Sequence, residues 1–273
     1  MVTRLFVAKG NDGNYLQHSV EIAAAVHLAS KRPEGRLHIA LAHGMAPFES
    51  CGALPGGQAR VLLHRALNAA QLAPTAGESR LVAAYRAASA SLDHYPNSAE
   101  LLRRAIGVDK LSGGITEVDS QKHSQLRDAW SGSCVIAVSS SWRGETGSGG
   151  VLTCPIPLEI PWLFTMDPMT YREAGYADDN NLYRADLERL STVLSSFVAG
   201  GKPGVAALFV YAVKPEIQPL FWAFVDQLAT QTGTTAESYW LTHQGGNRNL
   251  AALLCSRIEL PTKLVPDGLH AGR

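Results

Sequence analysis

Strand-length apolar runs alternate with helix-length segments through the second half of this chain, and this alternation constrains its fold more than any other feature. Segments of strand length occur at 115–118, 134–138, 162–166 and 205–213. A helix is expected at 120–130, and apolar residues at helical spacing predict helices at 187–197 and 217–228. Because a strand, a helix and a second strand in succession favour parallel pairing, we predict a mostly parallel sheet with helices on both faces.

A hairpin is predicted at the end of this sheet. The pieces 238–242 and 250–256 are strand-like, and the turn-rich segment 245–249 joins them. Such a hairpin adds an antiparallel strand at or near one edge. The sequence therefore predicts an α/β fold with a mostly parallel sheet and a terminal antiparallel hairpin.

The first half of the chain adds further elements to the same fold. Helical spacing predicts a helix over 14–30, and the alternation within 37–41 predicts a strand. A second helix is expected over 98–106, with Ser98 as its N-cap, because a serine hydroxyl can accept a backbone N–H of the first turn. The strand at 134–138 is bounded by serines and is expected to be buried.

One region stands apart from the strand–helix alternation. Residues 56–92 are rich in Ala, Leu and Arg, and the break at 74–77 divides them into two expected helices. We therefore interpret 44–95 as a helical insertion that follows the first strand. The whole chain, 1–273, is expected to be one domain with this insertion inside it.

The charge balance weighs against an extended nucleic-acid surface. Lysine and arginine together number 24, and aspartate and glutamate also number 24, so the net charge is zero. Proteins that bind RNA through its phosphates usually carry a basic excess. Hydrophobic residues make up 46% and charged residues 18%, which is typical of a folded chain rather than a disordered one.

Neither a metal site nor a disulfide is predicted. The cysteines are widely spaced and form no CxxC pair: Cys51, Cys134, Cys154 and Cys255. This pattern is typical of reduced thiols. The N-terminus lacks the apolar core of a signal peptide, and no uncharged apolar run reaches membrane-spanning length. We expect a cytoplasmic protein with no membrane partner.

Polar residues follow several of the predicted strands. In open α/β sheets, ligands bind at the carboxyl ends of the strands, where this chain carries His43, Glu117, Ser140 and Asp167. Glu117 ends a strand and precedes a helix, so its carboxylate can accept hydrogen bonds from both hydroxyls of a nucleoside ribose. We expect Glu117 and Asp167 to follow neighbouring parallel strands and to face one cleft.

Several short motifs occur in order along the chain. They are the run Gly10–His18, then Ala42-His43-Gly44, Tyr95-Pro96-Asn97-Ser98, Glu117 and Asp167-Pro168. Their order and spacing resemble the RlmJ family, whose members methylate adenine N6 in large-subunit ribosomal RNA with S-adenosylmethionine. The resemblance extends from about residue 4 to residue 230. It implies a Rossmann-like class I methyltransferase fold with S-adenosylmethionine as the cofactor.

The resemblance also implies roles for individual residues. Those that would hold the cofactor are His18, His43, Ser98, Glu117, Ser140 and Asp167. Asp167 and the carbonyl of Pro168 would accept hydrogen bonds from the acceptor amine, which raises the electron density on its nitrogen and aims it at the methyl group. Tyr171 would stack on an extruded base. The implied catalytic set is Asp167, Pro168 and Tyr171.

Departures from the family pattern leave three functions open. Leu41, Met45 and Pro47 replace an aspartate and two glycines of the family's cofactor loop. Met169 and Thr170 stand where the family has a second proline and an aromatic residue. The alternatives are a nitrogen-directed methyltransferase acting on adenine N6 in RNA, a methyltransferase of a small molecule or peptide, and a non-catalytic methyltransferase-like binding or scaffold protein.

Overall fold

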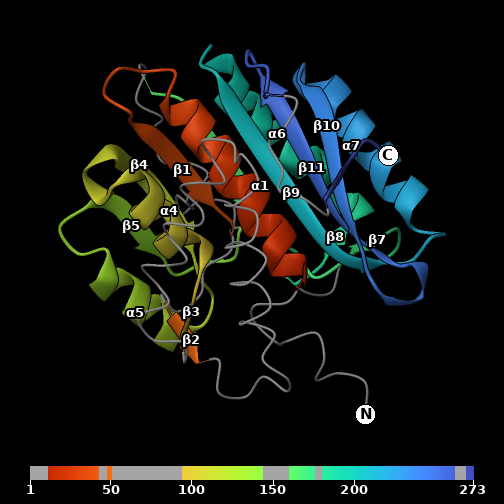
Figure 1. The fold of residues 1–273 in the computed structure, drawn as a ribbon, viewed down its shortest axis with the longest axis horizontal. Coiled ribbons are helices and arrows are strands. Elements are labelled where there is room, and N and C mark those ends of the chain that lie inside the picture. The colour runs from red at the N-terminus through yellow and green to blue at the C-terminus, as the bar shows by residue number, and fades with distance from the viewer. Residues whose placement is uncertain (1–11, 43–47, 51–93, 144–159, 176–179, 262–268) are drawn as a thin grey trace.

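One large sheet organises the chain. The computed structural model describes residues 12–42, 48–50, 94–143, 160–175, 180–261 and 269–273 (Figure 1). The sheet has eight strands in the order β12-β10-β11-β9-β6-β1-β4-β5. Their bounds are β1 (Leu37–Leu41), β4 (Leu111–Thr116), β5 (Cys134–Val138), β6 (Trp162–Met166), β9 (Gly204–Val213), β10 (Thr235–Thr242), β11 (Arg248–Ser256) and β12 (His270–Ala271).

Parallel pairing dominates this sheet. The strands β5, β4, β1, β6 and β9 are parallel to one another. The last long strand, β11, lies between β9 and β10 and runs antiparallel to both, and the short β12 pairs antiparallel with β10. The predicted mixed α/β architecture, with a mostly parallel sheet and a terminal antiparallel hairpin, is confirmed.

Helices cover both faces of the sheet (Figure 1). On one face lie α1 (Asp12–Ala29), α4 (Ser98–Ile106) and α5 (Ser120–Ala129), and on the other lie α6 (Leu187–Ala199) and α7 (Gln218–Thr232). Alternate residues of β6 point to opposite faces, as the strand period requires. Leu163 belongs to the core under α1, whereas Phe164 packs against Phe197 of α6 with ring centroids 6.3 Å apart.

Two small sheets lie outside the large one. The strands β2 (Phe48–Ser50) and β3 (His94–Pro96) pair antiparallel, and β7 (Tyr171–Arg172) pairs parallel with β8 (Leu182–Tyr183). Short 3-10 helices occur at Val108–Lys110, Arg184–Asp186 and Gln244–Gly246. Of the predicted insertion 44–95, the described ends are extended. The helices expected at 56–92 lie outside the described residues.

Two local predictions are wrong. The N-cap of α4 is Asn97, one residue before Ser98, because the Asn97 side chain accepts the backbone N–H of Glu100 at 2.8 Å. The strand β5 is not buried. It forms the edge of the sheet that the described residues build, and Ile136 is 51% exposed.

None of the helices in the described part of the chain is both long enough and apolar enough to cross a membrane.

A buried ion pair joins the segment after β5 to the start of α6. Nε and Nη2 of Arg143 donate to the two carboxylate oxygens of Asp186 at 2.9 and 2.7 Å. Nη2 also donates to the carbonyl of Asn181 at 2.8 Å, and the guanidinium lies over the ring of Trp142. Asp186 is fully buried and also accepts the N–H of Tyr183 at 2.8 Å. Paired in this way, the Asp186 carboxylate ties two distant segments together.

We expect Arg143→Met to lower the free energy of unfolding by about 3–5 kcal/mol, because it leaves the buried Asp186 carboxylate without its countercharge. Urea denaturation measures this loss. The matched control is Arg127→Met, since Arg127 pairs with Asp128 on the exposed surface. That control should change stability by no more than about 0.5 kcal/mol. Equal, small changes in both variants would contradict the structural role of the buried pair.

Candidate functional site

The order of the sheet defines one edge as the place to look for a ligand. The chain leaves the central strand β1, builds β4 and β5 on one side, and returns to β6 on the other side. Such a reversal is the topological switch point at which open α/β sheets bind ligands, beside the carboxyl ends of the strands. Glu117 directly follows β4, and Asp167 directly follows β6.

Glu117 and Asp167 do not follow neighbouring strands, which corrects the expectation from the sequence. The strand β1 lies between β4 and β6 and pairs with both. Two inter-strand spacings therefore separate the two positions, about 10 Å between backbones. The carboxyl groups lie at the same edge of the sheet, but one extended ligand rather than a single small group would have to reach both.

Asp167 belongs to a chain of polar contacts across four elements. The Tyr211 hydroxyl, from β9, donates to Oδ1 of Asp167 and lies 3.1 Å from Oε1 of Gln17 on α1. Nε2 of Gln17 in turn donates to Oγ of Ser98 at the start of α4, at 3.0 Å. Two residues implied by the resemblance, Ser98 and Asp167, are thus connected through two that the sequence did not identify.

The sequence analysis did not identify Gln17 and Tyr211, for two different reasons. Gln17 sits in the first motif, but at a position where the motif matches only at the neighbouring His18. Tyr211 lies in an apolar strand, where an aromatic residue is expected to serve the core. Only the pairing of β9 with β6 places its hydroxyl beside Asp167.

The backbone of β9 is distorted directly after Tyr211. Ala212 has a φ of +48°, in the left-handed region that residues other than glycine seldom adopt. Its N–H donates to the side chain of Asn249 at 2.9 Å, and the register between β9 and β11 shifts between Arg248 and Leu250. Asn249 is buried, so this contact fixes the distortion and with it the direction of the Tyr211 side chain.

A fully buried carboxyl group, that of Glu21 on α1, lies close to the same polar contacts. Glu21 has no exposed surface, and neither of its carboxyl oxygens makes a hydrogen bond of normal geometry with a described residue. The hydroxyls of Ser98 and Thr165 lie nearby and lower its pKa, but burial dominates and raises the pKa of Glu21 to about 7. The charge of Asp167 adds to this rise.

Glu117 is buried at the start of α5. Its carboxylate accepts the backbone N–H of Asp119 at 2.8 Å, and burial raises its pKa above the ordinary value. An ionised carboxylate has about four acceptor positions. This single backbone contact therefore does not exhaust the capacity of Glu117 to bind a ligand hydroxyl.

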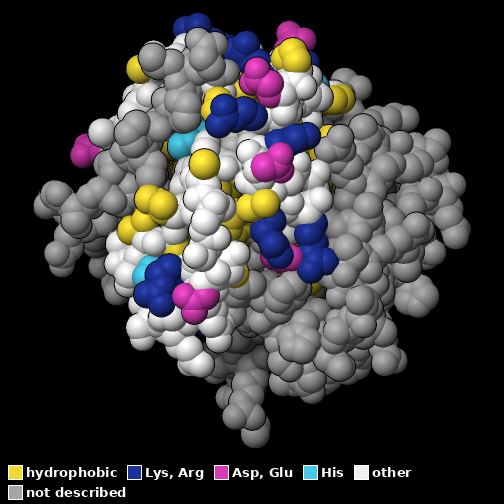
Figure 2. Space-filling view, turned by 90° about the vertical axis from the view of Figure 1, so that its left-hand side faces the viewer, with side chains coloured by type: hydrophobic (Ala, Val, Ile, Leu, Met, Phe, Trp, Pro, Cys, Tyr) yellow, Lys and Arg dark blue, Asp and Glu magenta, His cyan; other side chains and the backbone are white. Residues whose placement is uncertain are grey.

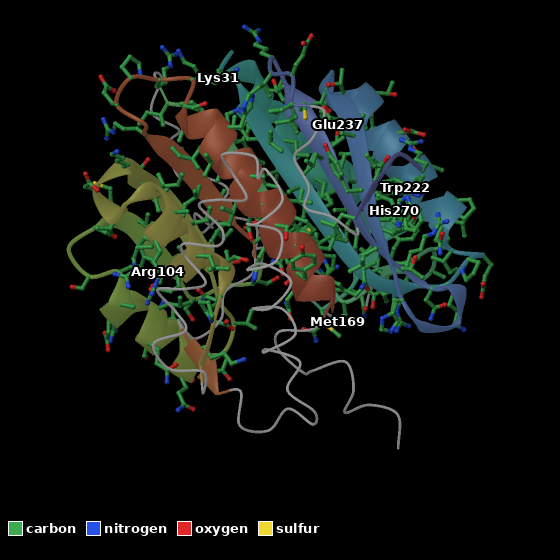
Figure 3. The ribbon with its side chains drawn as sticks, viewed as in Figure 1. Lys31, Arg104, Met169, Trp222, Glu237 and His270 are labelled. Carbon is green, nitrogen blue, oxygen red and sulfur yellow. The ribbon has the colours of Figure 1, made fainter. Side chains whose placement is uncertain are left out.

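The other predicted site residues are distributed as follows. His18 is buried on α1, Pro168 is buried after β6, and His43 lies outside the described residues. Ser140 follows β5, and its hydroxyl oxygen is buried without a hydrogen-bond partner among the described residues. Met169 is 38% exposed and lies at the end of the sheet where α1 begins (Figure 3).

Tyr171 lies inside the core. Its ring packs against Phe221 and Phe224 of α7, with centroids 5.8 and 5.3 Å away, and its hydroxyl donates to Glu173 at 2.5 Å. Tyr171 is 2% exposed. The ring faces are therefore occupied by α7, and stacking on a base would require this contact to open.

The comparisons with known proteins show the fold. No family model matches the chain, and no curated protein matches it. The structure is similar to the crystal structure of protein LPL1258 from Legionella pneumophila strain Philadelphia 1, described with the family model DUF519. The two chains are 9% identical, the alignment covers 97% of each, and the TM-score is 0.68. At this identity the likeness concerns the fold alone.

We expect Glu21→Gln to stabilise the protein more at pH 8 than at pH 5. The pKa of Glu21 is about 7 when folded and 4.5 as its ordinary value, so the folded state binds the extra proton between these values. Stability is then lost as the pH rises through this window. The difference in ΔΔG between the two pH values should be roughly 2–3 kcal/mol.

Urea denaturation of the parent and the variant at both pH values measures this difference. Glu34→Gln is the matched control, because Glu34 is exposed and precedes β1, at the amino end of that strand. A pH-independent effect of Glu21→Gln would show that Glu21 does not titrate in this range.

Proposed function

We propose that this chain is an S-adenosylmethionine-dependent methyltransferase that transfers a methyl group to a nitrogen atom. The observation that carries the proposal is the position of Asp167-Pro168, directly after β6 at the switch point of the sheet. The resemblance to the RlmJ family gives this pair the role of holding the accepting amine. The contact chain from Asp167 to Ser98 supports the same assignment, because it joins the acceptor residue to a residue implied for the cofactor.

The architecture is consistent with this proposal. A mostly parallel sheet that ends in an antiparallel hairpin is the arrangement expected of a Rossmann-like class I methyltransferase. The fold shared with the DUF519 protein extends over 97% of the chain. Many α/β folds serve other functions, so the fold alone does not define the reaction.

The residues at the edge fit the cofactor. Glu117 retains acceptor capacity for ribose hydroxyls, and the buried hydroxyl of Ser140 lacks a partner among the described residues. We assign cofactor binding to Glu117 and Ser140 together with His18, His43, Ser98 and Asp167. When bound, the cofactor supplies a methyl group activated by the sulfonium charge.

The protein's own contribution is to position the acceptor. The lone pair of an exocyclic amine is delocalised, so the nitrogen is a weak nucleophile. An Asp167 carboxylate and the Pro168 carbonyl accept its N–H bonds, which raises electron density on nitrogen and orients the lone pair. The proton lost by the nitrogen after methylation leaves through this carboxylate or to solvent.

The methyl acceptor is adenine in RNA or a nitrogen atom of a small molecule or peptide. Several observations favour the small molecule or peptide. The net charge is zero. Figure 2 shows basic and acidic side chains interspersed on the described part of one face, without a basic track. The burial of Tyr171 leaves the catalytic segment without a stacking ring at the surface. These features favour a small molecule or peptide as the acceptor. A non-catalytic scaffold is the alternative if the cofactor does not bind.

We expect Glu117→Ala to weaken S-adenosylmethionine binding about tenfold or more, because hydrogen bonds to a charged group contribute on the order of 1.5–3 kcal/mol. Isothermal titration calorimetry measures the affinity. Glu34→Ala is the control, since Glu34 lies at the amino end of β1, away from the proposed site. Unchanged affinity in Glu117→Ala would remove this residue from the site, and an absence of binding by the parent protein would support the scaffold alternative.

We expect Asp167→Ala to lower the methylation rate strongly while leaving cofactor affinity less affected, because the lost contact is made to the acceptor. Radiolabelled methyl transfer to protein-free ribosomal RNA and to small amines measures the rate. We expect little activity on bulk ribosomal RNA. Efficient and salt-sensitive methylation of adenine would instead restore the full family function, and activity that survives in Asp167→Ala would contradict the role of this residue.

A further inference from the structure

The Tyr211 hydroxyl contacts Asp167, and neither the family pattern nor the comparisons assign Tyr211 a role. Its hydroxyl contacts Asp167 on one side and Gln17 on the other. We propose that Tyr211 is a positioning residue that holds the Asp167 carboxylate in the orientation required by the acceptor. This proposal rests on the proposed function, because it concerns the same acceptor residue.

The backbone around Tyr211 supports this role. The residue after it, Ala212, is held at a φ of +48° by a hydrogen bond to the buried Asn249. A left-handed residue other than glycine or asparagine costs about 1–3 kcal/mol and persists where the surrounding structure imposes it. The distortion lies at the carboxyl end of β9, next to β6, which Asp167 follows. It therefore affects the direction of the Tyr211 side chain.

Counting the protons shows in which direction the hydrogen bonds from Ser98 to Asp167 are donated. A phenol has one proton to donate, yet the Tyr211 oxygen faces both Asp167 Oδ1 and Gln17 Oε1. A half turn of the Gln17 amide exchanges its oxygen and nitrogen. Gln17 Nε2 then donates to Tyr211, and Ser98 donates to Gln17. Every donor in the chain points towards Asp167, which accepts as a carboxylate.

The opposite direction would leave Asp167 without its charge. With the amide as it is placed, Tyr211 donates to Gln17 and Gln17 donates to Ser98. Asp167 must then be protonated to donate to the phenol. A carboxyl group that is partly exposed at a strand end is ordinarily a carboxylate at neutral pH. The direction that leaves the charge on Asp167 is therefore favoured.

The chemical consequence concerns the accepting nitrogen. A phenol that donates to one carboxylate oxygen fixes the plane of the carboxylate and favours its ionised form. The acceptor amine then meets a fixed, charged acceptor, and the carboxylate has acceptor positions beyond the one filled by the phenol. Tyr211 acts through Asp167 and need not touch the acceptor itself.

The deciding experiment follows the carboxyl carbon of Asp167 by carbon-13 NMR as the pH changes, in the parent protein and in Tyr211→Phe. Loss of the phenol donor should move the titration midpoint of Asp167 upwards by about one pH unit or more, a tenfold change in its proton affinity. Tyr239→Phe is the matched control, because Tyr239 is a buried tyrosine whose hydroxyl donates to Glu237 at 2.8 Å on β10. An unchanged midpoint in Tyr211→Phe, or an equal shift in the control, would overturn the proposal.

A second variant, Gln17→Met, tests the same proposal if Tyr211→Phe fails to fold. Gln17→Met removes the contact behind the Tyr211 hydroxyl and keeps both Tyr211 and Asp167. It should shift the Asp167 midpoint upwards by a smaller amount than Tyr211→Phe. If Tyr211→Phe does not fold, this variant decides alone, and the absence of any shift rejects the proposal.

Kinetics separates this proposal from the proposed function. Tyr211→Phe should lower kcat about tenfold or more and leave cofactor affinity and the KM for S-adenosylmethionine within about twofold. A uniform loss of cofactor affinity would mark a general structural defect and would count against positioning. If the parent protein neither binds the cofactor nor transfers a methyl group, the proposed function fails, while the NMR titration still shows whether Tyr211 controls Asp167.

Discussion

The parallel pairing of β6, β1 and β4 is the constraint on which the rest of the structure depends. The strand β1 lies in the middle of the five parallel strands, and all five of its residues are buried, so both of its faces must be covered. Parallel neighbours also require crossover connections. The chain therefore adds β4 and β5 on one side of β1 and then begins the other side at β6. This reversal brings the ends of β1, β4 and β6 to one edge.

The helix α1 buries several polar residues. A helix that lies on a sheet ordinarily turns apolar residues inwards, yet α1 also buries Gln17, His18, Ser19 and Glu21. Burying such groups costs free energy unless they find partners. Gln17 finds Ser98 and Tyr211, while Glu21 avoids the cost of a buried charge by remaining largely protonated up to about neutral pH. Retained polar groups of this kind are typical of a site rather than of a core.

The segment after β6 is fixed by backbone hydrogen bonds and by packing. Its backbone is bound on both sides: the N–H of Met169 donates to the carbonyl of Asn180 at 2.6 Å, and its carbonyl accepts the N–H of Tyr211 at 3.2 Å. The chain then enters β7, which turns Tyr171 into the core under α7. Asp167 and Pro168 stand at the strand end, and the aromatic residue of the segment packs in the core.

The sequence by itself determined the fold class, the order of the helices and of the longer strands of the large sheet, and the placement of Glu117 and Asp167 at strand ends. These properties are local, because the period of apolar residues and the point at which it stops are visible within a few residues. Only the tertiary structure decided which strands became neighbours. It placed β1 between Glu117 and Asp167, made β5 an edge, and joined Tyr211 to Gln17 across 194 positions of sequence. Alternation along a chain predicts that a sheet will form, but contacts between side chains depend on the order of its strands, which no local pattern encodes.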